Sequence, residues 1–145
     1  ALAMVVSTTL QVSGAAAAPD VLTWADGLGG LVFAVGFGIE VVADWQLQTH
    51  RNDPGRQGTV LDTGLWGWSR HPNYFGEALL WWGLWICSLD TPWGWASVVS
   101  PVLMTWLLVR VSGVAMMDAH MRKTRPAYAA YVDRVPGFFP RRPKR

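Results

Sequence analysis

Apolar residues fall into three long runs along the chain, over residues 27–47, 74–89 and 96–114. A helix needs about 20 predominantly apolar residues to cross a bilayer. The first run has that length, whereas the other two are short for a full span. We therefore predict that these two form a helical hairpin that tilts little or extends into the headgroup layer. The pattern predicts an all-α fold, a polytopic transmembrane bundle.

The segment over residues 115–134 mixes charged and apolar positions and predicts a juxtamembrane helix at the C-terminal end. Asp118, Arg122 and Arg125 follow one another at steps of four and three residues, and Tyr128 comes three residues later. This spacing places all four on one helical face. We expect this face to close over a bound cofactor. The alternative is a solvated surface helix with an internal ion pair.

The chain opens on Ala1 and an apolar stretch, residues 1–12, that is too short to span a membrane. A loop of small residues, 13–20, follows it. No basic region precedes the apolar stretch, so a signal peptide is not expected. We expect residues 1–145 to be a single membrane domain that forms the C-terminal part of a longer chain.

Polar residues interrupt the first run in a regular way. Glu40, Asp44 and Gln48 recur every four residues, and Arg51 follows three later. One interpretation is that this polar stripe merely marks the point where the helix leaves the membrane. An unpaired charge at such depth costs about 2.5 kcal/mol or more, so we predict that Glu40 and Asp44 face a polar, ligand-bearing cavity. On the same run, Gly30, Ala34 and Gly38 predict close approach of a neighbouring helix.

A turn rich in Gly, Trp and basic residues leads into the second run, in the sequence GLWGWSRHPNYFGEALLWW. Proline suits the first turn of a helix, so we predict a helix start near Pro72. Free N–H groups there, beside Arg70 and His71, predict an anion or phosphate site. Asn73 and Glu77 share one face, and a carboxylate within an apolar segment is a functional candidate.

Composition agrees with a membrane location. The chain is 51% hydrophobic and 15% charged, and it holds ten Trp, which concentrate at membrane interfaces and in apolar ligand pockets. The alternative is a Trp-rich soluble core. A net charge of +2 is too small to indicate nucleic-acid binding. The single cysteine, Cys87, excludes an internal disulfide.

Standard motifs are missing. The sequence holds no complete dinucleotide fingerprint, no phosphate loop, no metal-ligand spacing and no serine nucleophile elbow. Three polar patches remain, all on one predicted membrane side: the positions 40, 44, 48 and 51, the turn over residues 66–77, and the positions 118, 122, 125 and 128. Such patches suit a large cofactor with phosphates, rings and ribose hydroxyls. Basic residues near Arg51 and in the tail predict a cytoplasmic C-terminus. That tail contains Arg141, Arg142, Lys144 and Arg145.

Three strings carry a resemblance to a known family: GLWGWSRHPNYFGE, the upstream GIEVVADWQL, and the downstream VSGVAMMDAHMRKTRPAYAAYVDRVPGFFP. Over residues 27–140 the chain resembles the membrane steroid 5-alpha-reductase-like family, in its bacterial branch of unknown function. The resemblance implies a polytopic helical protein whose C-terminal half holds NADPH. It also implies hydride transfer to a carbon–carbon double bond in a sterol-like or other lipid enone.

The resemblance and the three patches together name the candidate cofactor-binding residues. They are Asp44, Arg51, Trp66, Arg70, His71, Asn73, Tyr74, Glu77, Asp118, Arg122, Arg125 and Tyr128. The family more often has Glu at the position of Asp118. Its substrate-polarising acid and tyrosine lie in N-terminal helices that this chain does not contain, so no catalytic residue is assigned.

Two alternatives stay open. Isoprenylcysteine carboxyl methyltransferases share an RHP-x-Y-x-G turn, which Arg70, His71, Pro72, Tyr74 and Gly76 also satisfy. That resemblance implies S-adenosylmethionine as the cofactor. The match of Asn73 and Glu77 favours the reductase. The third possibility is a non-catalytic membrane scaffold or subunit.

Overall fold

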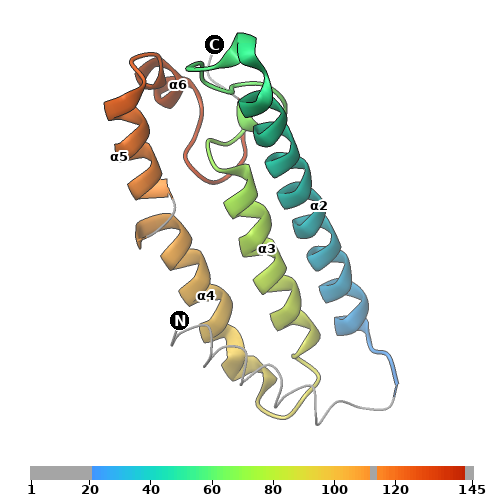
Figure 1. Cartoon of the computed structure of the whole chain (residues 1–145). Coiled ribbons are helices and arrows are strands. Elements are labelled where there is room, and N and C mark those ends of the chain that lie inside the picture. The colour runs from blue at the N-terminus through green and yellow to red at the C-terminus, as the bar shows by residue number, and fades with distance from the viewer. Residues whose placement is uncertain (1–20, 112–113, 143–145) are drawn as a thin grey trace. The chain divides into compact units, whose positions relative to one another are not determined.

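The computed structural model describes residues 21–111 and 114–142 of the chain (Figure 1). Within these ranges every regular element is helical, which confirms the predicted all-α class. The α-helices are α2 (Trp24–Asn52), α3 (Pro72–Cys87), α4 (Val99–Trp106), α5 (Val114–Thr124) and α6 (Tyr128–Arg134). Short 3-10 turns lie at η1 (Pro54–Arg56), η2 (Gly64–Gly67) and η3 (Gly94–Val98), and a π-helical turn lies at η4 (Leu107–Val111).

Two stretches of the described chain are long and apolar enough to cross a membrane. They are Trp24–Asn52, with 29 residues, and Gly94–Thr124, with 31. The predicted helix start at Pro72 is confirmed, because α3 begins at this residue. The predicted loop over residues 13–20 and the basic residues Lys144 and Arg145 lie outside the described residues.

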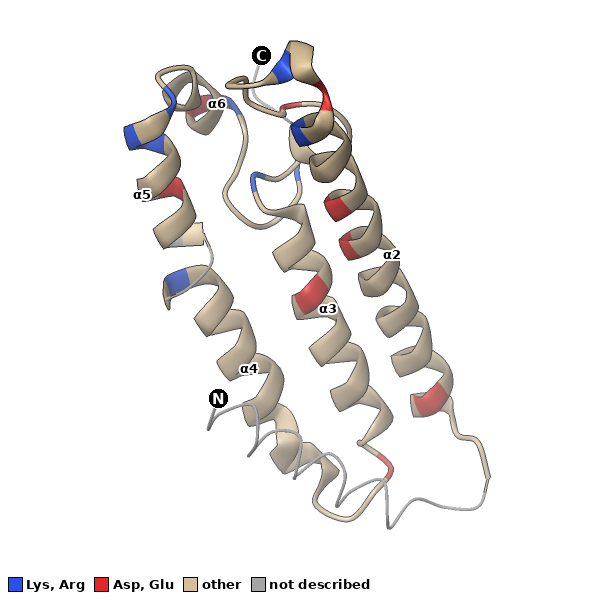
Figure 2. Ribbon diagram, viewed as in Figure 1, with Lys and Arg blue, Asp and Glu red and all other residues tan. Residues whose placement is uncertain are grey.

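The chain divides into two compact units. The first comprises residues 1–37 and 77–106, and the second comprises residues 38–76 and 107–145. Acidic residues occur in both units, as Figure 2 shows for the described part, but all 12 Lys and Arg residues of the sequence belong to the second. The division therefore separates an apolar unit without basic side chains from a basic one.

In the first unit, α2 begins at a local cap. The Asp26 carboxylate accepts hydrogen bonds from the Thr23 backbone nitrogen at 2.9 Å and from its hydroxyl at 3.1 Å. The Asp26 nitrogen in turn donates to the Thr23 hydroxyl at 3.4 Å. This reciprocal pattern satisfies N–H groups that the first turn of a helix leaves without intrahelical partners.

Two glycines let α2 and α3 approach closely in the first unit. A Cβ at Gly83 would lie 2.6 Å from the Phe33 backbone nitrogen, and one at Gly29 would lie 2.6 Å from the Gly83 carbonyl. The predicted close approach at Gly30, Ala34 and Gly38 is not made by α3, because a Cβ at Gly30 or Gly38 would meet nothing within 4 Å among the described residues. Neighbouring helix positions differ by about 100° in direction, so regular spacing marks a face without showing what packs on it.

The predicted helix over residues 115–134 is wrong as a single element. α5 ends at Thr124 and α6 begins at Tyr128. Pro126 lies in the gap, where it lacks an N–H donor and disfavours a helical conformation of the residue before it. Asp118 and Tyr128 are therefore on different helices and do not share one helical face.

The core of the second unit is built around α6. Tyr128, Tyr131 and Val135 are almost fully buried. Val60, Met121 and Val132 pack against them. The loop after α2 and the helix α5 thus meet at the buried face of α6.

We expect Gly83→Ala to lower the thermal unfolding midpoint of the detergent-purified protein. The added methyl would overlap the α2 backbone, and overpacking costs about 1–3 kcal/mol, which exceeds the gain of about 1 kcal/mol in helix propensity. Gly30→Ala is the matched control, because that position is open. Equal midpoints for the two variants would contradict the assigned contact.

Candidate cofactor site

The turn over residues 64–71 is joined to α2 by side-chain bonds to backbone groups. The Trp66 indole donates to the Ala43 carbonyl at 3.0 Å, and the Leu65 nitrogen donates to the Gln46 side-chain oxygen at 3.1 Å. Gly64, at the start of the turn, has a φ of 61°. Glycine adopts this left-handed conformation without steric cost, so it allows the sharp change of direction next to α2.

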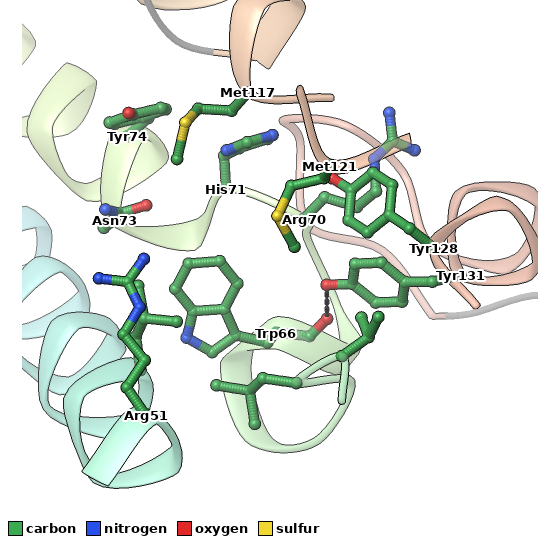
Figure 3. A pocket seen from close by; sticks show the side chains of 13 residues that line it. Arg51, Trp66, Arg70, His71, Asn73, Tyr74, Met117, Met121, Tyr128 and Tyr131 are labelled. Carbon is green, nitrogen blue, oxygen red and sulfur yellow. Dashed lines mark hydrogen bonds between the residues drawn. The ribbon is translucent and has the colours of Figure 1, made fainter. Parts of the chain in front are cut away.

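The C-terminal tail holds the same turn from another side. The Arg70 nitrogen donates to the Pro136 carbonyl at 2.9 Å, and the Ser69 hydroxyl donates to the Phe138 carbonyl at 2.9 Å. The Tyr131 hydroxyl donates to the Trp66 carbonyl (Figure 3). The backbone polar groups of the turn thus find partners in segments about 65 residues away in sequence.

The Arg70 side chain connects the turn to α5 and α6. Its Nε donates to the Asp118 carboxylate at 3.3 Å, and its Nη2 donates to the other carboxylate oxygen. Its Nη1 donates to the carbonyls of Val135, at 2.7 Å, and Val132, at 3.3 Å. Four of the five guanidinium donors are thereby used within the protein. Arg70 therefore mainly organises the site.

Asp118 is shared by three side chains. Besides Arg70, it accepts hydrogen bonds from His71 Nε2 at 3.1 Å and from the Tyr128 hydroxyl. The His71 ring stacks on Tyr74 with centroids 5.3 Å apart. Since a carboxylate only accepts, the histidine nitrogen that faces it carries a proton. One carboxylate therefore orients a guanidinium, an imidazole and a phenol.

Both tyrosines of α6 are held in their protonated form. Burial, followed by the hydrogen bond to Asp118, raises the pKa of Tyr128 above its ordinary value. Burial, followed by the nearby Tyr128, raises the pKa of Tyr131. At neutral pH the two phenols are therefore hydrogen-bond donors.

These residues enclose a cavity of about 90 Å³ (Figure 3). Most of its wall is aromatic or aliphatic, with a few polar groups. It is lined by Leu47, Arg51, Val60, Leu61, Trp66, Arg70, His71, Asn73, Tyr74, Met117, Met121, Tyr128 and Tyr131.

A larger hollow of about 520 Å³, called the basic hollow for Arg51, His120 and Arg125 in its lining, shares Arg51, Met117 and Met121 with this cavity. Gly58, His120, Thr124 and Arg125 complete its lining. Ligand pockets commonly have volumes of about 300–1,000 Å³. The two spaces together offer an aromatic compartment next to a cationic one.

The structure brings most of the predicted site residues to this place. Seven of them line the cavity, namely Arg51, Trp66, Arg70, His71, Asn73, Tyr74 and Tyr128. Arg125 lines the basic hollow, where its Nη1 also donates to the Thr59 carbonyl at 2.7 Å. Asp44 and Asp118 are bonded to wall residues.

Two predicted residues line neither the cavity nor the basic hollow. They are Arg122, which is exposed on α5, and Glu77, which belongs to the first unit. The cavity also contains residues that the sequence did not single out. Met117 and Met121 are one helical turn apart, and this spacing could have placed them on the same face as Asp118.

We expect Asp118→Asn to destabilise the protein by about 3 kcal/mol, because it leaves the mostly buried Arg70 guanidinium without its counter-charge. Asp118→Glu should restore part of the stability, since it keeps the charge. The control is Asp133→Asn, at an exposed position of α6. Thermal unfolding in detergent measures the difference, and a midpoint for Asp118→Asn equal to that of the control would contradict the network's role.

Comparison with known proteins identifies the family of this chain. Residues 1–135 match the family described as "Protein of unknown function (DUF1295)". This family is steroid 5-alpha-reductase-like. An uncharacterized protein of Schizosaccharomyces pombe, C594.04c, is 32% identical over 87 residues. That alignment covers 54% of this chain and 23% of the yeast protein, so it spans less than a quarter of that relative. No solved structure matches the chain significantly. The chain belongs to the DUF1295 family, and the resemblance to steroid 5-alpha-reductases is confirmed at that level.

Proposed function

We propose that this chain is the cofactor-binding half of an NADPH-dependent membrane reductase. Its substrate class would be a sterol-like or other lipid enone, in which a carbon–carbon double bond is reduced. The observation that carries the proposal is the aromatic cavity beside a basic hollow, with a shielded acceptor in the cavity wall. That acceptor is Asn73 Oδ1, which has no hydrogen-bond partner among the described residues.

The chemistry of the lining fits a dinucleotide. Trp66 and the neighbouring tyrosines offer flat apolar faces to rings. Arg51 and Arg125 in the basic hollow suit phosphate oxygens. Asn73 Oδ1 suits a donor such as an amide or a hydroxyl, because a shielded acceptor without a partner costs about 1–3 kcal/mol.

Bound NADPH would supply a hydride to the substrate. The residues of this chain bind and orient the cofactor, and their packing excludes water. The bonds of Asp118 to Arg70, His71 and Tyr128 hold three wall side chains in place before the cofactor arrives. Such preorganisation lowers the entropy lost on binding. We assign no proton donor to the substrate.

The distribution of charge suggests the orientation. All 12 Lys and Arg residues belong to the second unit, and basic segments next to membrane spans stay on the cytoplasmic side. In the proposal, the second unit faces the cytoplasm, where NADPH is available. The substrate would reach the protein from the lipid phase.

We expect Arg51→Ala to weaken NADPH binding by about tenfold or more, because a charge-assisted phosphate contact is lost. Arg134→Ala is the control, since Arg134 pairs with Asp62 at an exposed position of the same unit. Fluorescence titration of the purified protein measures both affinities. An equal effect of the two substitutions would contradict the assigned phosphate contact.

The same titration separates the alternative functions. Binding of NADPH supports the reductase, and binding of S-adenosylmethionine without NADPH supports the methyltransferase. A protein that binds neither cofactor would be a scaffold, and the proposal would fail.

We expect cysteines at Arg56 and Arg141 to react with a membrane-impermeant reagent from the cytoplasmic side. Both positions are exposed and belong to the basic unit. The substitutions are made in a Cys87→Ser background, which removes the single native thiol of the chain. Labelling of the two sites from opposite sides would refute the proposed topology.

A further inference from the structure

Asp44 and Asn73 form a side-chain pair at the edge of the cavity. The Asn73 amide nitrogen donates to the Asp44 carboxylate at 3.0 Å. Asn73 lines the cavity, whereas Asp44 is bonded to it from α2. The structure thus places Asn73 in the wall and Asp44 beside it, at an exposed position of α2.

The pair determines which way the amide points. An amide has a donor end and an acceptor end of almost the same shape, so its orientation depends on its neighbours. The Asp44 carboxylate only accepts hydrogen bonds, which draws the Asn73 nitrogen toward α2. A flipped amide would set two acceptor oxygens against each other. Figure 3 shows the Asn73 nitrogen on the side of α2 and its oxygen on the opposite side.

The backbone on both sides of the pair is fixed by packing. Asn73 follows Pro72, which is fully buried at the start of α3. Asp44 follows Ala43, which is fully buried and whose carbonyl accepts the Trp66 indole N–H. These contacts hold the backbone of both residues, and the hydrogen bond between the two side chains sets the orientation of the amide.

The acceptor end has no partner among the described residues. Asn73 Oδ1 is shielded from solvent and makes no hydrogen bond there. Buried polar groups in folded proteins are nearly always paired, so an unpaired oxygen in a cavity wall indicates a ligand that donates to it.

We infer that Asp44 is a positioning residue that holds the Asn73 amide with its carbonyl oxygen toward the ligand. A hydroxyl can pair with either end of an amide, so this orientation selects a ligand with an N–H₂ donor. This inference rests on the proposed function. NADPH carries two such donors, the carboxamide of its nicotinamide and the amino group of its adenine. A ligand group that only accepts hydrogen bonds would meet the oxygen of Asn73 without a bond.

Binding of analogues by the purified protein tests the inference. The probes are NADPH, its acetylpyridine analogue without the carboxamide N–H₂, and its deamino analogue without the adenine amino group. We expect the analogue that lacks the N–H₂ group bound by Asn73 to bind the wild-type protein about tenfold more weakly than NADPH. In Asp44→Asn the amide can flip, and the preference for NADPH over this analogue should fall to about twofold.

Two results would overturn the inference. One is equal affinity of the wild-type protein for all three nucleotides. The other is a loss of affinity in Asp44→Asn by the same factor for each nucleotide, which would indicate a general structural role of Asp44. Gln48→Ala is the matched control, because Gln48 lies on the same helix and its side chain donates to Asn52 at an exposed position.

A second measurement needs no ligand. The 145-residue chain contains two asparagines, Asn52 and Asn73, so selective ¹⁵N-asparagine labelling yields two side-chain amide signals. Asn73→Asp assigns them by removing one. The variant here is Asp44→Ala, which adds no third asparagine. We expect hydrogen exchange of the Asn73 amide to be slower in the wild-type protein than in Asp44→Ala, with Asn52 unchanged.

Equal exchange in both proteins would overturn the positioning role of Asp44. If the wild-type protein binds no nucleotide, the proposed function fails, and the amide signals alone decide whether Asp44 orients Asn73. The two failures are therefore distinguishable.

Discussion

The ion pair between Arg70 and Asp118 is the interaction on which the second unit depends. It joins residues 48 positions apart, and both side chains are largely buried. Two charges removed from water are tolerated only if their remaining hydrogen-bonding capacity is also satisfied. Here the guanidinium also donates to two carbonyls near the end of α6, and the carboxylate also accepts from His71 and Tyr128. The pair therefore fixes the side chains of His71 and Tyr128 and the backbone at the end of α6.

This network explains the character of the cavity. Because Asp118 accepts the Tyr128 hydroxyl and the His71 N–H, these side chains turn polar atoms toward the carboxylate and contribute ring surface to the wall. The groups left for a ligand are then few. In the cavity wall the proposed function uses Arg51 for a phosphate and Asn73 Oδ1 for a donor group, and Arg125 in the basic hollow adds a second phosphate contact.

The two units suit the two substrates of the proposed reaction. The first unit has no basic side chain and exposes many large apolar residues, so it is compatible with a lipid surrounding. The second unit carries the whole positive charge of the chain together with the cavity. A soluble anionic cofactor and an apolar substrate would thus meet surfaces of matching chemistry.

The sequence by itself determined the helical class, the start of α3 at Pro72 and the turn that carries the wall residues Trp66, Arg70 and His71. These features depend on local properties, namely the length of apolar runs and the fixed φ of proline. Pro126 already carried the signal for the break between α5 and α6. Only the tertiary structure decided that Gly29, rather than Gly30, meets α3, and that Asp44 accepts a hydrogen bond from Asn73 at the edge of the cavity. Regular spacing places residues on a helical face, but the partner of that face depends on contacts between segments distant in the chain.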